Sequence, residues 1–284
     1  NVSNETKEKV NAAITALGFV PNTIASALSS KKTGRAALVL DVNRHAQTVD
    51  EIPMQYIIGA INKAKERGMD IITVFFTMIA EMSVEEMVRY FQSQSIEGLI
   101  ICGLSKEDIS LRKLVESGKF KCVLIDAPGV SENTSSIHID NEKAQYEVAK
   151  KFLNGKDYKK ILYISGKKNG YVSEERLIGM TRLADELALQ VLVSKEAIIC
   201  ASDLMAIGAM KALIDMDIYR PVCGFDGVSL MGYAGKQMHT VRQDFQHIAA
   251  SAVEELSRLM EGGNGQELVM PHKLIRIKYL DVLS

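Results

Sequence analysis

The chain has 284 residues, of which 47% are hydrophobic and 24% charged, and its net charge is -1. This composition excludes disordered and fibrous proteins and leaves a globular protein with one large core or two moderate ones. The longest apolar runs, such as 98–103 and 197–201, fall far short of the roughly 18 residues of a membrane-spanning helix. The opening NVSNETKEKV lacks the apolar stretch of a secretory signal, so we expect a cytoplasmic location and no membrane partner.

The first predicted element is an amphipathic helix within VSNETKEKVNAAITALGFVPN. Ser3 is a candidate N-cap, Gly18 is a candidate C-cap, and Val10, Ile14 and Leu17 share one face. A single helix has no core of its own, so its apolar face must pack on something else. We expect a pair of helices before Asn1, absent from this sequence, that would complete a small three-helix domain.

The next segment, PNTIASALSSKKTG at 21–34, leaves room for only about two helical turns, and isolated helices of that length are marginal in water. This segment therefore requires a partner to fold. A plain flexible linker is the alternative.

From Gly34 onward, short apolar strands alternate with amphipathic helices. Strands are expected in AALVLDV, DIITVFF, GLIICG, KCVLID and KILYISG, and helices in IIGAINKAKERG, VEEMVRYFQSQ, 111–117, EKAQYEVAKKFLNG and SEERLIGMTRLADELAL. Continuous apolar strands separated by helices indicate parallel sheets covered on both faces. The fold class is therefore α/β, and the length favours two doubly wound sheets.

One place breaks this alternation, because QVLVS runs directly into KEAIICASD without a crossover helix. Either QVLVS is not a strand of the sheet or residues are absent around Ser194 and Lys195. We favour the second explanation, since the loop in IYRPVCGFDG also looks short.

Charge is unevenly distributed along the chain. Residues 1–35 carry five basic and two acidic side chains, a net charge of +3, and the remaining 249 residues carry 29 basic and 33 acidic side chains, a net charge of -4. A basic arm on a mildly acidic body indicates a polyanionic partner for the arm. A solvated terminal helix would account for the charges equally well.

The cysteines and histidines do not form a recognisable metal site. Their spacing matches neither a zinc site nor a redox pair, and we expect buried reduced thiols at Cys102, Cys122, Cys200 and Cys223. The five histidines are scattered, so the sequence predicts no metal and no cofactor.

Residues 2–34 resemble the end of the DNA-binding headpiece and the hinge of the lactose-repressor (LacI/GalR) family. The resemblance continues through IEGLIICG, SSIHIDN, EERLIGM, ASDLMAIGAMKAL, VCGFDG and HTVRQDF, in this order and over nearly the whole chain. It implies two lobes of the type I periplasmic-binding-protein kind. The expected boundaries are 1–33 for the headpiece end and hinge, 36–138 with 243–262 for one lobe, and 139–242 with 266–284 for the other.

The same resemblance implies a DNA-binding transcriptional regulator, most often a repressor of carbohydrate genes, acting as a homodimer on pseudo-palindromic operator DNA. In the family, the segment matching 22–29 is a hinge helix that enters the minor groove, where a leucine, here Leu28, wedges between base pairs. Contacts to DNA are implied for Ser3, Thr6, Asn22, Ala25 and Leu28.

The small-molecule effector is expected between the lobes, where ligands meet the carboxyl ends of parallel strands. Candidate contacts are Asp126 after KCVLID, Asp226 after VCGF, Ser202 with Asp203 after AIICA, Arg176 at the start of a helix, and Gln47 after the first strand. Carboxylates and an arginine suit the hydroxyls of a sugar or polyol. Asp203 as a helix cap and Asp126 as a plain loop residue are the alternatives. Without tryptophan, stacking would rely on Tyr171, Phe225 or Phe76.

Other classes of protein fit less well. No dinucleotide fingerprint, phosphate-binding loop or nucleophile elbow is present, and Glu174 and Glu175 are adjacent on a helix and point in different directions, so we expect no enzyme. A stand-alone sugar-binding protein for transport would share the two-lobed body, but it should carry a signal sequence and lack the hinge. A phosphoprotein co-regulator is a further possible partner.

Overall fold

The computed structural model describes residues 6, 34–41, 51–191, 196–234 and 237–277. The chain divides into two compact units, 1–33 and 34–284. Within the first unit only Thr6 is described, and it lies exposed in a helix. Ser3, Asn22, Ala25, Leu28 and the hinge segment 22–29 lie outside the described residues.

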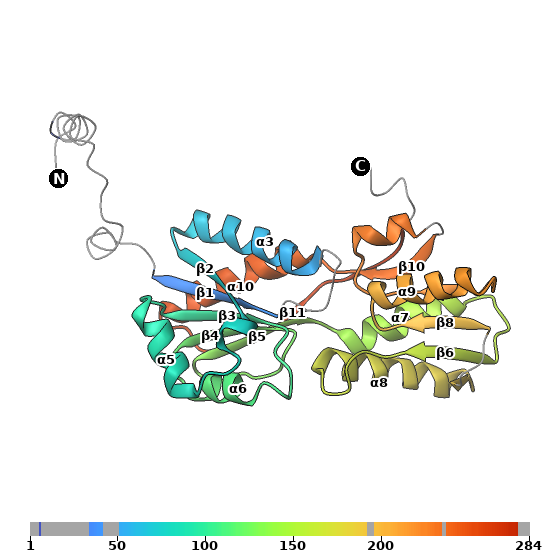
Figure 1. Ribbon diagram of the computed structural model, residues 1–284, viewed down its shortest axis with the longest axis horizontal. Coiled ribbons are helices and arrows are strands. Elements are labelled where there is room, and N and C mark those ends of the chain that lie inside the picture. The colour runs from blue at the N-terminus through green and yellow to red at the C-terminus, as the bar shows by residue number, and fades with distance from the viewer. Residues whose placement is uncertain (1–5, 7–33, 42–50, 192–195, 235–236, 278–284) are drawn as a thin grey trace. The chain divides into compact units, whose positions relative to one another are not determined.

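The first sheet has six strands in the order β11-β5-β4-β3-β1-β2, and every neighbouring pair is parallel (Figure 1). Its strands are β1 (Arg35–Leu40), β2 (Asp70–Phe75), β3 (Gly98–Cys102), β4 (Lys121–Ile125), β5 (Thr134–Ile139) and β11 (Glu267–Met270). The central strands β1, β3 and β4 are almost entirely buried, because helices cover both faces of the sheet.

Helices α3 (Glu51–Arg67) and α10 (Phe245–Met260) cover one face of the first sheet, and α5 (Val84–Ser93), α6 (Ile109–Glu116) and the short α4 (Phe76–Ile79) cover the other. In α5, the Ser83 hydroxyl accepts a hydrogen bond from the Glu86 backbone N–H, and the Glu86 carboxylate accepts one from the Ser83 N–H. This capping box satisfies two of the backbone donors that every helix start leaves without a partner. We call this sheet with its helices the first lobe.

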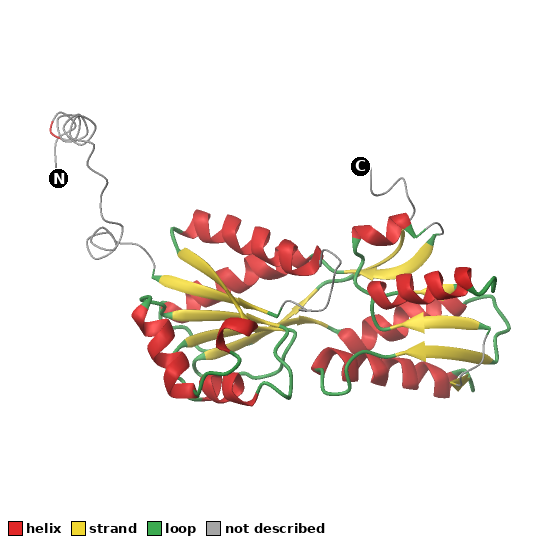
Figure 2. Cartoon of the chain, viewed as in Figure 1, coloured by secondary structure: helices red, strands yellow, loops and turns green. Residues whose placement is uncertain are grey.

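The second sheet has the order β12-β10-β9-β8-β6-β7. Its strands are β6 (Lys160–Ile164), β7 (Gln190–Val191), β8 (Ala197–Cys200), β9 (Val222–Cys223), β10 (Met238–Arg242) and β12 (Lys273–Ile277). Helices α7 (Asn141–Leu153) and α8 (Tyr171–Glu186) cover one face, and α9 (Asp203–Asp215) and the 3-10 helix η1 (Ser229–Tyr233) cover the other (Figure 2). We call this sheet with its helices the second lobe.

The chain passes between the two sheets three times, from β5 to α7, from β10 to α10 and from β11 to β12. Two of these passages lead directly into a capped helix. The Asp140 carboxylate accepts from the Lys143 N–H at 2.9 Å at the start of α7, and the Asp244 carboxylate accepts from the His247 N–H at 3.0 Å at the start of α10. The caps fix where each helix begins after the crossing.

The structure confirms the predicted α/β fold with two largely parallel sheets and differs from the sequence expectation in two details. β12 pairs with β10 in the antiparallel direction, an arrangement common at the edge of such sheets. Residues 267–270 were expected in the second lobe with the rest of 266–284, but they form β11 and pair with β5 of the first sheet. Gln190 and Val191 of QVLVS form a strand that pairs with β6 on the side opposite β8, which contradicts the alternative that QVLVS lies outside the sheet; Ser194 and Lys195 lie outside the described residues.

All four cysteines are buried and unpaired, as the sequence predicted. The described residues contain no group of three or more His, Cys, Asp or Glu side chains that could hold a metal ion. A search of the described helices found none that is long and apolar enough to cross a membrane.

Candidate functional site

A cavity of about 260 Å³ lies where strands of both sheets end. From the first lobe it is lined by residues that follow β1, β3 and β4, among them Gly103 and Asp126, and by Tyr56 of α3. From the second lobe Arg176, Asp226 and Gln243 line it. The carboxyl ends of parallel strands thus meet around one space, the position at which open α/β sheets bind ligands. We call it the cleft cavity.

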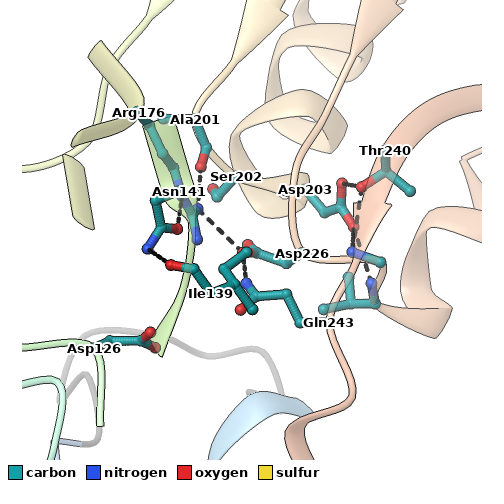
Figure 3. Close-up of polar contacts among 12 residues, drawn as sticks. Asp126, Ile139, Asn141, Arg176, Ala201, Ser202, Asp203, Asp226, Thr240 and Gln243 are labelled. Atoms are coloured by element: carbon teal, nitrogen blue, oxygen red, sulfur yellow. Dashed lines mark hydrogen bonds and ion pairs between the residues drawn. The ribbon is translucent and has the colours of Figure 1, made fainter. Parts of the chain in front are cut away.

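Arg176 is the centre of the polar network on the second-lobe side (Figure 3). Its guanidinium donates to the Asn141 amide oxygen at 3.0 Å, to the Ala201 carbonyl at 2.5 Å and to the Asp226 carboxylate at 3.1 Å. The guanidinium carbon also lies 3.7 Å from the ring centroid of Phe225. Arginine suits this position because its planar group can stack on a ring and donate in several directions at once.

Asp226 has a backbone conformation unusual for a residue with a side chain, with φ at 125°. Its N–H donates to the Val241 carbonyl at 3.0 Å, and its carbonyl accepts from the Gln243 N–H at 3.2 Å. The Gln243 side-chain amide also donates to the Asp226 carboxylate at 3.1 Å. Such strain typically costs about 1–3 kcal/mol and persists where surrounding bonds enforce it, often at ligand sites.

Asp126 occupies the corresponding position in the first lobe, directly after β4, and its φ is 61°. The Tyr56 hydroxyl donates to Asp126 Oδ2 at 3.1 Å, while Asp126 Oδ1 is buried and has no hydrogen-bond donor among the described residues. Gln243 Oε1 is likewise buried without a donor. Buried acceptors nearly always have a partner, so the cleft cavity presents two acceptors suited to the donors of a ligand.

The buried carboxylates share a common electrostatic character. Burial raises the pKa of Asp126 and of Asp226, and the Arg176 guanidinium partly opposes the rise in both. Burial, reinforced by the negative charge of Asp226, raises the pKa of Asp203. The Arg176 guanidinium thus stabilises the ionised forms of Asp126 and Asp226.

Ser202 and Asp203, expected beside the ligand, carry structural contacts in the described structure. The Ser202 hydroxyl caps α9 by accepting from the Met205 N–H at 3.2 Å, so the cap is Ser202 and not Asp203. The Asp203 carboxylate accepts from the Thr240 hydroxyl at 2.7 Å and from the N–H groups of Gly227 and Val228 at 2.7 Å and 2.9 Å (Figure 3). Asp203 therefore holds the loop that carries Asp226.

The remaining sequence candidates are distributed differently. Gln47 lies outside the described residues. Phe225 is fully buried beneath Arg176, the Tyr171 ring lies under the Lys106 ammonium, and Phe76 lines a separate cavity. The aromatic side chains that do line the cleft cavity are Tyr56 and Phe245.

Sequence reasoning missed Tyr56, Asn141 and Gln243. Asn141 is the last residue of the motif SSIHIDN, and Gln243 lies inside the motif HTVRQDF. A search for polar residues after every strand would have found both. Tyr56 carries no such signal, because its position within an amphipathic helix is typical of a core residue.

The raised pKa of Asp203 gives a pH-dependence of stability. Above about pH 4 the Asp203 carboxyl keeps its proton in the folded protein, whereas the same carboxyl has lost its proton in the unfolded chain. The free energy of unfolding that this group contributes therefore falls as pH rises. Asp203→Asn mimics the protonated form, since its oxygen can accept from both backbone N–H groups and its amide can donate to Thr240. We expect the free energy of unfolding of this variant, relative to the parent, to increase with pH in urea titrations from about pH 4 upward. A difference that is constant across the range would contradict this assignment.

Comparisons with known proteins identify sequences that this chain resembles over most of its length. No family model matches the chain. Catabolite control protein A of Staphylococcus aureus is 23% identical over 309 aligned positions, which cover 96% of this chain and 90% of that protein. Catabolite control protein A of Staphylococcus xylosus is 22% identical over 311 positions, with the same coverage.

Solved structures share the fold. A Lac repressor dimer bound to operator and an anti-inducer aligns with a TM-score of 0.78 at 20% identity, covering 98% of this chain and 91% of that one. The transcriptional regulator CelR in complex with cellobiose aligns with a TM-score of 0.72 at 21% identity, covering 97% and 91%. With relatives matched over nearly their whole length and the ordered motifs from IEGLIICG to HTVRQDF, the chain resembles regulators of the LacI/GalR family in sequence and shares the fold of the solved ones.

Proposed function

We propose that this regulator represses carbohydrate genes and that a sugar or related polyol in the cleft cavity controls its affinity for operator DNA. The observation that carries the proposal is that Asp126 and Gln243 each have a buried oxygen, Oδ1 and Oε1, without a donor among the described residues, and that both residues line one cavity with Arg176. A polyol offers hydroxyl donors for both oxygens and hydroxyl or ring acceptors for arginine. The effector contacts we propose are Asp126, Arg176, Asp226 and Gln243, with Ser202 and Gln47 as further candidates from the sequence.

The cavity lies between two lobes, and this position supplies a mechanism. Asp126 belongs to the first lobe and Gln243 follows the last parallel strand of the second, so one ligand would bond to both. A ligand that fits only one relative position of the lobes shifts the protein toward it by its difference in affinity for the two states.

Several polar contacts that join the two lobes are exposed and therefore easily exchanged. Lys106 of the first lobe forms an ion pair with Glu174, and the Asn169 amide donates to Glu107 at 2.6 Å. A third contact joins η1 of the second lobe to α3 of the first lobe: the Ser229 N–H and hydroxyl donate to the Glu51 carboxylate at 2.8 Å and 3.0 Å. Exposed pairs of this kind contribute about 0–1 kcal/mol each, so a bound ligand can outweigh them.

DNA binding and assembly complete the proposal. The solved relative named above is a dimer on operator DNA, and we propose a homodimer on a pseudo-palindromic operator for this chain as well. The proposed DNA contacts are those of the headpiece end and hinge: Ser3, Thr6, Asn22, Ala25 and Leu28. A phosphoprotein co-regulator is a second proposed partner.

A thermal-shift screen against sugars, sugar phosphates and nucleosides tests the effector. A ligand at about 100 times its dissociation constant adds about 2.7 kcal/mol to the free energy of unfolding, which raises the melting temperature by several degrees. Asp126→Asn should reduce the shift given by the hit, because an amide in place of the carboxylate removes an acceptor. Asp157→Asn, which removes an exposed carboxylate of the other lobe, should leave the shift unchanged.

The DNA part is tested by selecting duplexes from a random library with the full-length protein. We expect a pseudo-palindromic consensus whose affinity changes at least several-fold when the hit is added. No hit in the whole panel contradicts the sugar as effector. A hit that leaves operator affinity unchanged contradicts the coupling between cavity and DNA.

A further inference from the structure

A second and larger cavity, of about 370 Å³, lies at the opposite edge of the second sheet from the cleft cavity. It is bordered by residues at the starts of β9 and β10 and at the ends of α7 and α9, whereas Asp226 and Gln243 follow the ends of the same two strands. The cavity therefore shares no lining residue with the effector site proposed above. We call it the basal cavity.

Cationic side chains gather on one wall of the basal cavity. His239 of β10 and Arg276 of β12 are register partners in an antiparallel pair, which places their side chains next to each other on the same face. The Lys156 ammonium lies 4.7 Å from the ring centroid of Phe152, and this ring also contacts His239 edge to face at 5.9 Å. Lys156 and His239 thus contact one aromatic ring, and Arg276 lies beside His239.

No carboxylate among the described residues of this cavity balances the cationic wall. Among the described residues, no Asp or Glu lines the cavity, and none of the ion pairs found there includes Lys156 or Arg276. Burial, together with the positive charges of Arg276, Lys151 and Lys156, lowers the pKa of His239. A bound anion would offset the positive charges of Arg276 and Lys156 beside this imidazole and would favour its protonated form.

The other wall of the basal cavity is apolar. Leu213 and Ile214 of α9, Pro221, and Met238 of β10 contribute to it. Ile214 is 61% exposed, a large exposure for an isoleucine within a concave site. A cavity with one cationic and one apolar wall is complementary to a ligand with an anionic head and an apolar body.

We propose that the basal cavity binds a small organic anion, in which a phosphate or carboxylate group meets Arg276, Lys156 and His239 and a short aromatic or aliphatic body packs on the apolar wall. Charge-assisted hydrogen bonds to arginine and lysine would orient the head group. The site is concave and of small-molecule size, which favours a low-molecular-weight ligand over a protein surface. This ligand is distinct from the sugar proposed for the cleft cavity.

The test uses phenyl phosphate as the probe, with phenylacetate, inorganic phosphate and benzyl alcohol for comparison, on the full-length protein by isothermal titration calorimetry. We expect phenyl phosphate to bind more tightly than inorganic phosphate, which lacks the apolar body, and than benzyl alcohol, which lacks the charge. The relative affinity of phenylacetate distinguishes a carboxylate ligand from a phosphate ligand. The double variant Lys156→Gln/Arg276→Gln should weaken binding at least about tenfold, because it removes two charged donors.

Proton NMR of the histidine rings locates the probe independently of the calorimetry. Bound phenyl phosphate should raise the pKa of His239, because a nearby negative charge stabilises the imidazolium. Lys65→Gln removes one positive charge from an exposed position in α3 of the first lobe, and it should leave both readouts unchanged. Lys156 and Arg276 are exposed, so their variants are expected to fold. The proposal is overturned by absent binding, by equal affinity of the double variant, or by a His239 pKa that phenyl phosphate does not move.

Discussion

Replacing Arg176 by alanine is expected to lower the free energy of unfolding by about 3–5 kcal/mol, the usual cost of removing one partner from a buried ion pair. Both side chains of the Arg176–Asp226 pair are only 8% exposed. Without the guanidinium, Asp226 must either hold an unpaired buried charge or take up a proton, and the Ala201 carbonyl and Asn141 amide would each lose a donor. Urea unfolding at neutral pH measures the loss.

Two comparisons make this prediction specific to the buried pair. Arg182→Ala, on the same helix, breaks an exposed pair with Glu142 and should cost about 0–1 kcal/mol. The cost of Arg176→Ala should also decrease as pH is lowered toward 5, since Asp226, with its raised pKa, becomes neutral there. A loss similar to that of Arg182→Ala, or a loss independent of pH, would contradict the central role of this pair.

Gly179→Ala is expected to destabilise the second lobe by about 1–3 kcal/mol, the typical cost of overpacking a tight interface. Gly179 of α8 faces the first turn of α7, and a Cβ atom there would lie 2.1 Å from the Glu142 carbonyl oxygen. The helices would have to separate, and Asn141, next to Glu142, would move with α7. Thermal unfolding should show the loss, and the affinity for the effector should fall as well, because Asn141 orients Arg176.

Gly208→Ala in α9 is the matched control. A Cβ atom at Gly208 meets nothing within 4 Å, so the only change is the better helix propensity of alanine, which should stabilise the protein by about 0.5–1 kcal/mol. The two glycine substitutions should therefore have opposite signs. Equal effects would mean that the close approach of α7 and α8 does not limit the packing.

Much of the fold could be predicted from the sequence, because the signals involved are local. Apolar strands such as GLIICG and KCVLID require burial on both faces, and the helices between them show the apolar spacing that covers a sheet. The rule that ligands bind after parallel strands selected Asp126 and Asp226 correctly as residues of the cleft cavity. Their roles as effector contacts await the ligand screen.

Other parts of the site depend on contacts between distant segments, which no local pattern encodes. Arg176 meets Asn141 and Asp226 across 35 and 50 residues of chain, and Tyr56 meets Asp126 across 70. The sequence offered Ser202 as an effector contact and Asp203 as a contact or a helix cap, whereas in the structure Ser202 caps α9 and Asp203 holds the loop after β9.

The sequence by itself thus determined the α/β class, the alternation of elements and the strand ends at which polar side chains stand, since each follows from residue type and spacing. The tertiary structure alone decided which of these side chains share a cavity, which strand β11 joins, and that His239 and Arg276 lie together at the basal cavity. The physical reason is that side-chain contacts, burial and pKa shifts arise only when the chain has crossed between the sheets and brought remote residues together.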